Sequence, residues 1–420
     1  MKPPFAYTIR HLRLDDIAKP FALDPTPGAG WYLVFWWKNL PLAHLYLEPG
    51  EPADEAAVLK KAVPLLRQTL QTYAPDRPAP PDEAGPDRIG LHRELEAVLR
   101  PRNVETLPSE VPVSVVLCTR NRAAHLRQCL RSLRSLDCRP AEIVVVDNAP
   151  VDDSTREVVR EFPGVVYCRE PRPGLDIARN TGYRHARSPV VAYTDDDVQV
   201  HPHWVYQVWK SFRNPAVAAM TGLVIAAELQ TEAQLIFEKH WSFNRGYTDK
   251  FYDQTFFENT LPFGPPVWEI GAGASMAFRR RVLEAVGGFD ERLDVGAAGC
   301  NGDSEMWFRV LNQGHTIHYN PRAVAFHTHR RELSALKNQL FHYMRGHTAA
   351  ALVQREVNRQ AGYLRHVFVA LPKYYYWLVR EGYPSFSFRH QTLGEEAKGM
   401  LSGLLFYLRN RKRRPDRRGI

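Results

Sequence analysis

The middle of the chain alternates short apolar runs with amphipathic stretches. The amphipathic stretches, such as 123–136, carry leucine and cysteine at helical spacing. The apolar runs are rich in β-branched residues, as buried parallel strands are. These runs are VSVVLCT at 113–119, EIVVVDNA at 142–149, GVVYCRE at 164–170 and PVVAYTDDD at 189–197. The alternation predicts an α/β domain at 111–332, built on a doubly wound, mostly parallel sheet.

The two flanks of this domain have different patterns. Residues 1–74 hold two strand-like runs and then a helical stretch, which predicts a small N-terminal α+β segment. Residues 75–110 begin with a proline-rich stretch and continue into one short helix, which is typical of a linker. Residues 333–420 predict a helical C-terminal extension with an apolar helix face at 393–408. That face either packs on the α/β domain or lies on an anionic membrane.

Charge and cysteine usage narrow the class of protein. The net charge is +9, but the last twelve residues supply +6 of it. Positive charge gathered at one end is not the basic stripe of a nucleic-acid-binding protein, so we do not expect nucleic acid as a partner. The five cysteines show neither a disulfide framework nor metal-ligand spacing. There is no apolar signal sequence and no run of the ~18 apolar residues that a membrane-spanning helix needs. We therefore expect a cytoplasmic protein.

Three consecutive aspartates, Asp195, Asp196 and Asp197, end the fourth predicted strand. Adjacent carboxylates repel one another, so they require a cation or open water. Oxygen ligands suit Mg²⁺ or Mn²⁺, which bind phosphates as well. The alternative is a solvated acidic turn or a helix cap. Asp147 ends the second predicted strand at the same sheet edge, where it either accepts a hydrogen bond from a nucleotide base or caps the next turn.

A second polar group follows a glycine-rich loop further along the chain. Asp303 and Glu305 lie at the start of a predicted helix. There the helix dipole stabilises them, or alternatively one of them takes a proton from an acceptor hydroxyl in a cleft. His327 and His329 stand two residues apart on a strand-like run, so they point to opposite faces. We expect one of them to enter the cleft and the other to be structural.

Five motifs carry a resemblance to a known family. In chain order they are VSVVLCTRNR, VVVDNA, GLDIARNTG, VVAYTDDD, and the segment that runs from GGFDE to GDSEMWFRVLNQGH. Their order and spacing resemble the family 2 glycosyltransferases of the GT-A fold, over about half the chain. In that comparison VVAYTDDD corresponds to the DXD motif. One departure is Gly302, which stands where the family usually has a glutamate before the catalytic aspartate.

The resemblance implies a role for each matching residue. Contacts to the nucleotide donor are implied for Thr119, Arg122, Asp147, Arg179, Asn180, Asp195 and Asp196. Binding of a divalent metal, Mg²⁺ or Mn²⁺, is implied for Asp197, Asp195 and His327. Asp303 is implied as the general base.

The implied activity is transfer of a sugar from a nucleotide-diphosphate sugar to an acceptor hydroxyl, with inversion, in surface polysaccharide or glycoconjugate synthesis. A glycan or a lipid-linked molecule would be the acceptor. The C-terminal helix and basic tail would place the enzyme peripherally at the inner face of a membrane. Two alternatives stay open. One is a nucleotidyltransferase on a similar sheet, although CTRNRAAHL lacks the glycines of a triphosphate loop. The other is a non-enzymatic nucleic-acid-binding protein that uses the basic tail.

Overall fold

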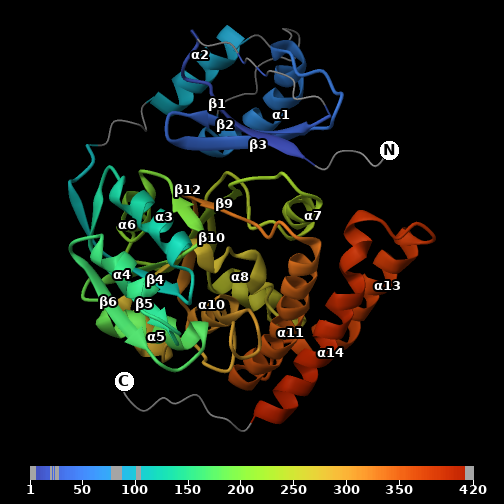
Figure 1. Cartoon of the computed structure of the whole chain (residues 1–420). Coiled ribbons are helices and arrows are strands. Elements are labelled where there is room, and N and C mark those ends of the chain that lie inside the picture. The colour runs from blue at the N-terminus through green and yellow to red at the C-terminus, as the bar shows by residue number, and fades with distance from the viewer. Residues whose placement is uncertain are drawn as a thin grey trace.

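The computed structural model describes residues 6–18, 21, 23, 28–76, 88–100 and 106–411. Figure 1 shows an N-terminal module in blue, a central α/β domain, and C-terminal helices in orange and red along one side. Residues 77–87, which belong to the predicted linker region 75–110, and the basic end at 412–420 lie outside the described residues.

The N-terminal module is a three-stranded sheet with two helices. Its elements are β1 (Tyr7–Arg13), β2 (Gly30–Trp37), β3 (Leu40–Leu47), α1 (Glu55–Tyr73) and α2 (Arg88–Leu99). We predicted that the helix now seen as α2 belongs to a linker. Instead, Leu91 and Leu95 of α2 join Leu66 of α1 in the core of the module. The first unit therefore includes α2, because the apolar face of that helix completes the core.

The strand β2 connects this module to the α/β domain. Side chains of a strand alternate between its two faces. Leu33 and Phe35 point into the core of the module, whereas Tyr32, Val34 and Trp36 pack against the α/β domain. This double contact explains why all eight residues of β2 are buried. On the α/β domain, the residues that pack against β2 include Leu223, Ile225, Tyr319 and Val324.

The α/β domain contains a nine-stranded sheet. Along one path its strands are β10 (Lys250–Tyr252), β12 (Thr316–His327), β9 (Val217–Ala226), β11 (Met276–Arg279), β7 (Val190–Asp195), β4 (Glu110–Thr119), β5 (Arg139–Asn148) and β6 (Val165–Glu170), and β8 (Val198–Val200) pairs with β12. The pairs among β7, β4, β5 and β6 are parallel, as is β9 with β12. Strands β8, β10 and β11 pair antiparallel. The predicted mostly parallel α/β sheet is thus confirmed.

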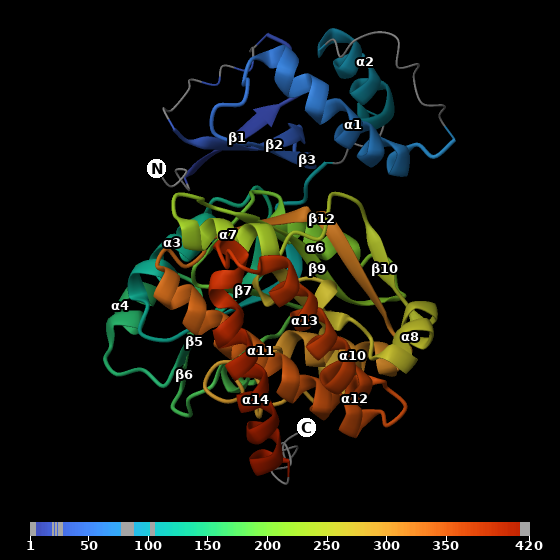
Figure 2. The ribbon, with the colours of Figure 1, turned by 90° about the vertical axis from the view of Figure 1, so that its right-hand side faces the viewer.

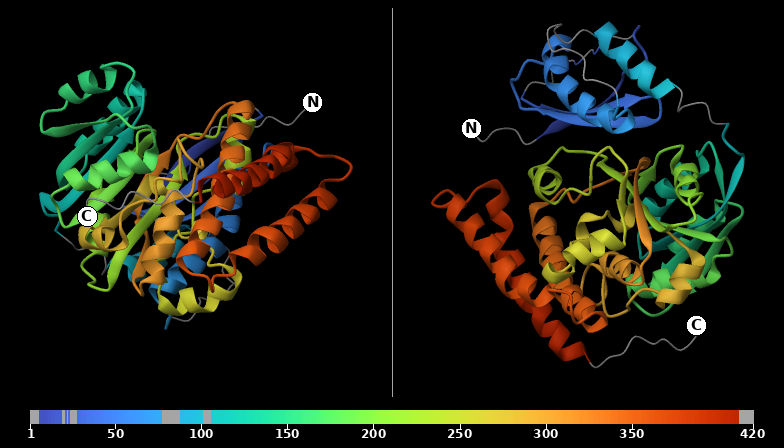
Figure 3. Two further views of the ribbon diagram at one scale, coloured as in Figure 1. Left: turned by 90° about the horizontal axis from the view of Figure 1, so that it is seen from below. Right: turned by 180° about the vertical axis from the view of Figure 1, so that it is seen from behind.

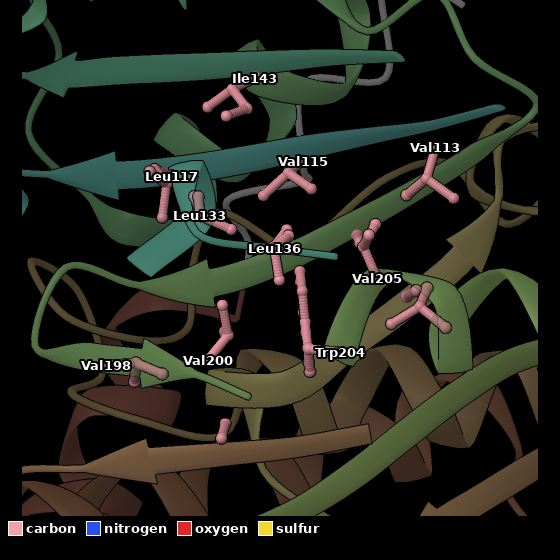
Figure 4. Close-up of a cluster of buried hydrophobic side chains, with 14 of the residues drawn as sticks. Val113, Val115, Leu117, Leu133, Leu136, Ile143, Val198, Val200, Trp204 and Val205 are labelled. Carbon is pink, nitrogen blue, oxygen red and sulfur yellow. The ribbon is translucent and has the colours of Figure 1, made fainter. Parts of the chain in front are cut away.

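Helices cover both faces of this sheet. They are α3 (Ala123–Arg134), α4 (Ser154–Arg160), α5 (Leu175–His185), α6 (Trp204–Ser211), α7 (Glu232–Trp241), α8 (Gln254–Thr260), α9 (Arg280–Val286) and α10 (Gly302–Asn312). Because side chains alternate between the two faces of β4, Val115 and Leu117 lie in one core with Leu133 and Trp204, as Figure 4 shows. Val116 points into the core on the other face.

The C-terminal extension is a set of helices on one side of the molecule (Figure 2). It comprises α11 (Leu333–Val357), α12 (Tyr363–Arg365), a π-helical turn (His366–Ala370), α13 (Leu371–Gly382) and α14 (Leu393–Asn410). We predicted that α14 presents one apolar face at 393–408. The helix instead packs on α11 through Gly399 and Gly403, where a Cβ would lie 2.3 Å from the carbonyl oxygens of Phe341 and Arg345. Part of the predicted face stays exposed, including Leu401 and Leu405.

Candidate active site

A cleft of about 1490 Å³ lies at the carboxyl ends of the central strands. Strands β4, β5 and β7 run in parallel and end at Thr119, Asn148 and Asp195, and all three residues line the cleft. In parallel sheets with helices on both faces, ligands bind at this edge. Residues of α11 and α13 also line this cleft, so the C-terminal extension forms part of its wall.

The side chain of Arg122 bridges two of the three clustered aspartates. Its guanidinium donates to Asp196 at 2.6 Å and to Asp197 at 2.8 Å. The Thr119 hydroxyl donates to the other oxygen of Asp196, also at 2.6 Å. A second guanidinium, that of Arg330, lies 4.0 Å from Asp197. The cluster therefore combines carboxylates and arginines, which are the groups that hold a metal ion and a diphosphate.

The aspartates of this cluster differ in acidity. Burial, together with the neighbouring Asp197 carboxylate, raises the pKa of Asp195 to about 7. Burial likewise raises the pKa of Asp196 to about 6, although Arg122 opposes the shift. Burial also acts on Asp197, but its cationic partners, among them Arg122, lower its pKa to about 2. Asp195 is therefore the carboxylate of this cluster that would gain most from an added cation.

His327 enters the cleft and belongs to a buried chain of hydrogen bonds. Its Nε2 lies 3.6 Å from an Asp197 oxygen. Its Nδ1 lies 3.0 Å from Nδ1 of His329, and Nε2 of His329 lies 2.9 Å from Glu238 on α7. Burial lowers the pKa of His327 to about 4, so the ring is neutral at neutral pH. His327 lines the cleft and His329 is buried, but the two rings do not lie on opposite faces as predicted, because β12 ends at His327 and the two imidazoles meet.

The donor atoms near the cluster suit a hard divalent cation. Asp195, Asp197 and His327 supply two carboxylates and a neutral imidazole, which is a ligand set that Mn²⁺ and Mg²⁺ accept. Within the described part of the chain, however, no three His, Cys, Asp or Glu side chains are placed close enough to hold an ion. Arg122 already pairs with one Asp197 oxygen. A metal ion would therefore require small side-chain movements here, but the chemistry of the site fits it.

Asp303 lines the same cleft at the first turn of α10. The backbone N–H groups of Gly273 and Ser304 donate to its two oxygens at 2.8 and 2.7 Å. Burial raises the pKa of this carboxyl, although Arg179 opposes the shift. A carboxylate that is held in place and has a raised pKa is suited to accept a proton.

A steric contact explains why position 302, where this chain departs from the family motif, is a glycine. A Cβ on Gly302 would lie 2.0 Å from an oxygen of Asp176. Asp176 is buried and accepts a hydrogen bond at 2.9 Å from Arg179, which also donates to Asp294 at 2.6 Å. A carboxylate therefore fills this space from α5, so residue 302 has no room for a side chain.

Two of the predicted nucleotide contacts do not line this cleft. Asp147 is fully buried beside Asn148, does not line this cleft, and accepts a hydrogen bond at 2.8 Å from the Tyr167 hydroxyl. Asn180 is also buried away from the cleft. Its side-chain amide donates a hydrogen bond to the carbonyl of Phe289 and accepts one from the N–H of the same residue. The remaining predicted residues all line the cleft: Thr119, Arg122, Arg179, Asp195, Asp196, Asp197, Asp303 and His327.

The structure adds an aromatic group that the motifs did not predict. Nε2 of His347 on α11 lies 2.8 Å from Nε2 of His366 in the π-helical turn. The Trp268 ring stacks on His366 with 4.8 Å between ring centroids. All three residues line the cleft. They come from three separate segments without a shared sequence pattern, so only the fold reveals this surface.

The fold and cleft define an α/β domain with a polar cleft at the carboxyl edge of a mixed sheet. Residues 114–287 match the family described as "Glycosyl transferase family 2". Residues 114–287 therefore form a family 2 glycosyltransferase domain, which confirms the resemblance seen in the motifs.

Individual relatives are similar over part of their length. The pre-mycofactocin glycosyltransferase of Mycobacterium tuberculosis is 27% identical, over 60% of this chain and 50% of its own. The validoxylamine A glucosyltransferase of Streptomyces hygroscopicus subsp. limoneus is 33% identical, over 33% of this chain and 32% of its own. This chain thus spans about half the length of the mycobacterial relative.

Among solved structures, the mannosyltransferase PcManGT from Pyrobaculum calidifontis, in complex with GDP-Man and Mn²⁺, aligns with a TM-score of 0.46 and 17% identity. The alignment covers 74% of this chain and 91% of that one.

Proposed function

We propose that this protein transfers a sugar from a nucleotide-diphosphate sugar to an acceptor hydroxyl. The observation that carries the proposal is one cleft, in a family 2 domain, that is lined by both the Asp195–Asp197 cluster and Asp303. The cluster provides groups for a metal and a diphosphate, and Asp303 provides a base. The family match favours sugar transfer over the nucleotidyltransferase and nucleic-acid-binding alternatives.

Asp195, Asp197 and His327 would hold the divalent metal, Mg²⁺ or Mn²⁺. Bound there, the ion would neutralise the donor diphosphate and stabilise charge on the leaving group. Arg122 and Arg330 stand beside the same carboxylates, so their guanidinium groups can bind the remaining phosphate oxygens. Thr119 and Arg179 complete the donor side of the cleft.

Asp303 would remove the proton of the acceptor hydroxyl while that oxygen attacks the anomeric carbon. The bond from this carbon to the donor phosphate oxygen breaks, and the nucleoside diphosphate leaves from the opposite face. A single displacement of this kind inverts the anomeric centre. The backbone donors from Gly273 and Ser304 fix the direction of the Asp303 carboxylate before the acceptor arrives.

The acceptor in this proposal is a glycan or a lipid-linked molecule, made during surface polysaccharide or glycoconjugate synthesis. The aromatic group of Trp268, His347 and His366 supports a sugar-like acceptor, since aromatic rings pack on the apolar faces of sugars. We also propose that the enzyme works in the cytoplasm, at the inner face of the membrane. All five cysteines are free thiols, which suits a reducing compartment.

Thermal unfolding with a panel of nucleoside diphosphates and nucleotide sugars tests the donor site. A ligand at ~100 times its Kd adds ~2.7 kcal/mol of stability, which a melting curve resolves. We expect one nucleotide to stabilise the protein only with Mn²⁺ or Mg²⁺, and Asp197→Ala to remove this effect. Asp152→Ala, at an exposed aspartate outside the cleft, serves as the matched control. Stabilisation that needs no metal and survives Asp197→Ala would contradict the proposed site.

A further inference from the structure

One continuous helix in the C-terminal extension is apolar and largely uncovered. It runs through α12, the π-helical turn and α13, from Tyr363 to Gly382. At 1.5 Å per residue this is a rod of about 30 Å. The stretch 367–379, VFVALPKYYYWLV, holds a single charged residue, Lys373. Figure 3 shows this helix with α14 on the outside of the molecule.

The exposure of this helix exceeds what a surface helix normally shows. A surface helix hides its apolar residues and presents polar ones. Here Tyr376 is 62% exposed and Phe368 is 53% exposed. Further exposed apolar or aromatic residues follow along the helix: Val369, Tyr374, Trp377 and Val379. Contiguous apolar surface of this kind marks an interaction site.

The helix α14 also carries exposed apolar residues. Leu401, Leu405 and Leu408 are 62%, 44% and 49% exposed. They are spaced four and three residues apart, so they share one face of α14. This is part of the face that we expected either to pack on the α/β domain or to lie on a membrane.

The two helices are fixed in this position by buried polar contacts. Arg389 forms two hydrogen bonds to Glu396 of α14, at 2.6 and 2.8 Å, and Glu396 is fully buried. The Tyr375 hydroxyl of α13 donates to the same carboxylate at 2.7 Å. Tyr375 and Leu393 also share an apolar cluster with Met344 of α11. The exposed surface therefore belongs to a rigid helical pair rather than to a loose segment.

The chemistry of the surface indicates what covers it. Between 363 and 382 the charged residues are Arg365, Lys373, Arg380 and one acid, Glu381. The Arg380 guanidinium lies 4.9 Å from the Trp377 ring centroid. Tyrosine and tryptophan next to arginine and lysine are typical of protein surfaces at the lipid headgroup layer. The sequence adds six Lys/Arg between 411 and 418, directly after α14.

We propose that α13 and the exposed face of α14 dock on an anionic lipid bilayer, with the apolar side chains in the headgroup region and the cations against lipid phosphates. In the described part of the chain, no helix is long and apolar enough to cross a bilayer. Contact is thus along the surface.

This docking has a consequence for how the acceptor reaches the site. The consequence rests on the proposed function. Ala370, Leu371 and Tyr374 belong to the docking helix and also line the cleft. The docking helix therefore forms part of the wall of the cleft. An acceptor with a lipid tail in the bilayer and its hydroxyl group in the water layer could reach Asp303 without leaving the membrane.

Flotation of the full-length protein with vesicles tests the docking surface. We expect the protein to float with vesicles of phosphatidylcholine and phosphatidylglycerol in about a 7:3 ratio, and to float less with phosphatidylcholine alone. The double substitution Phe368→Ser/Trp377→Ser should reduce flotation by at least about tenfold, because each side chain buries apolar area in the bilayer. Val151→Ser is the matched control, since Val151 is 76% exposed at a site outside the extension.

Each remaining outcome would overturn the proposal. Absence of flotation for the wild-type protein, or full flotation of the double variant, would do so. Flotation that depends only on residues 412–420, as shown by their deletion, would assign binding to the tail. A dimer in light scattering that the double substitution dissociates, without lipid binding, would make a second copy the occupant. Flotation requires no catalysis, so its failure is distinct from failure of the proposed function, which the nucleotide panel reports.

Discussion

The Nδ1 atoms of His327 and His329 lie 3.0 Å apart in a buried pair. When both imidazoles are neutral, each has one N–H donor and one acceptor nitrogen, so one Nδ1 donates to the other at this contact. The Glu238 carboxylate accepts from Nε2 of His329, which leaves Nδ1 of His329 as the acceptor. His327 must then donate from Nδ1 and keep a lone pair on Nε2, which faces Asp197. The tautomer of His327 is thus set as that of a metal ligand.

We expect Glu238→Gln to weaken metal binding. The amide has nearly the shape of the carboxylate but can donate to His329, which would reverse the tautomers along the chain. Loss of such an outer partner typically costs ~10–100-fold in metal affinity. Titration of Mn²⁺ into the protein with a bound nucleoside diphosphate, followed by electron paramagnetic resonance of free Mn²⁺, measures this change directly.

Glu232→Gln is the control for that measurement. Glu232 lies on the same helix, α7, and accepts a hydrogen bond from Gln391 instead of a histidine. It should leave the Mn²⁺ affinity unchanged. If Glu238→Gln retains wild-type Mn²⁺ affinity, the histidine pair has no part in holding the ion.

Replacing the proposed base should separate chemistry from donor binding. Asp303→Asn keeps the side-chain shape but removes the proton acceptor, and a general base contributes ~10²–10⁴-fold. We expect kcat to fall by that factor while the donor Kd stays within about threefold. Donor hydrolysis and calorimetric titration of the donor provide the two values. A kcat within ~10-fold of wild type would remove Asp303 from this role.

The acidity of Asp195 predicts how stability depends on pH in the metal-free protein. Burial and Asp197 raise its pKa to about 7, whereas the unfolded chain has an aspartate pKa of ~3.9. The folded state therefore holds the extra proton between these values, and this contribution to stability is lost as pH rises through about 7. Asp195→Asn should melt a few degrees higher than wild type at about pH 8 and show a smaller gain at about pH 5.

Melting curves in a chelating buffer test this dependence. Added Mn²⁺ with the nucleotide should then stabilise wild type and not Asp195→Asn. An equal gain from the substitution at both pH values would show that the buried charge of Asp195 is not its cause.

Much of the site could be predicted because it is local to strand ends. Thr119 and Asp195 end two adjacent apolar runs, and parallel strands bring such ends to one edge of the sheet. The apolar runs were long and β-branched, so the strand assignment needed no tertiary information. The position of Asp303 after the glycine-rich loop made it a candidate, and the family resemblance implied its role as the base.

The two predicted residues that do not line the cleft lie on correctly predicted elements, but their side chains point in another direction. Neighbouring side chains on a strand point to opposite faces, so the cleft receives Asn148 and not Asp147. On α5, Arg179 reaches the cleft whereas the next residue, Asn180, bonds Phe289. Glu238 was missed because it is 91 positions from His329, and no local pattern links them.

The last prediction concerns the glycine that replaces the family's glutamate. Gly302→Ala places a Cβ 2.0 Å from the Asp176 carboxylate, which cannot retreat because it is buried against Arg179. We expect a loss of ~1–3 kcal/mol in unfolding free energy, as for other overpacked sites. Gly394→Ala is the matched control. A Cβ there meets nothing within 4 Å at the start of α14, so alanine should be neutral or stabilising by up to ~1 kcal/mol. Urea denaturation measures both values.

Adding Asp176→Ala to Gly302→Ala removes the clash, so the double variant should lose less stability than the two single losses added together. Strict additivity would mean that Asp176 does not exclude a side chain from position 302.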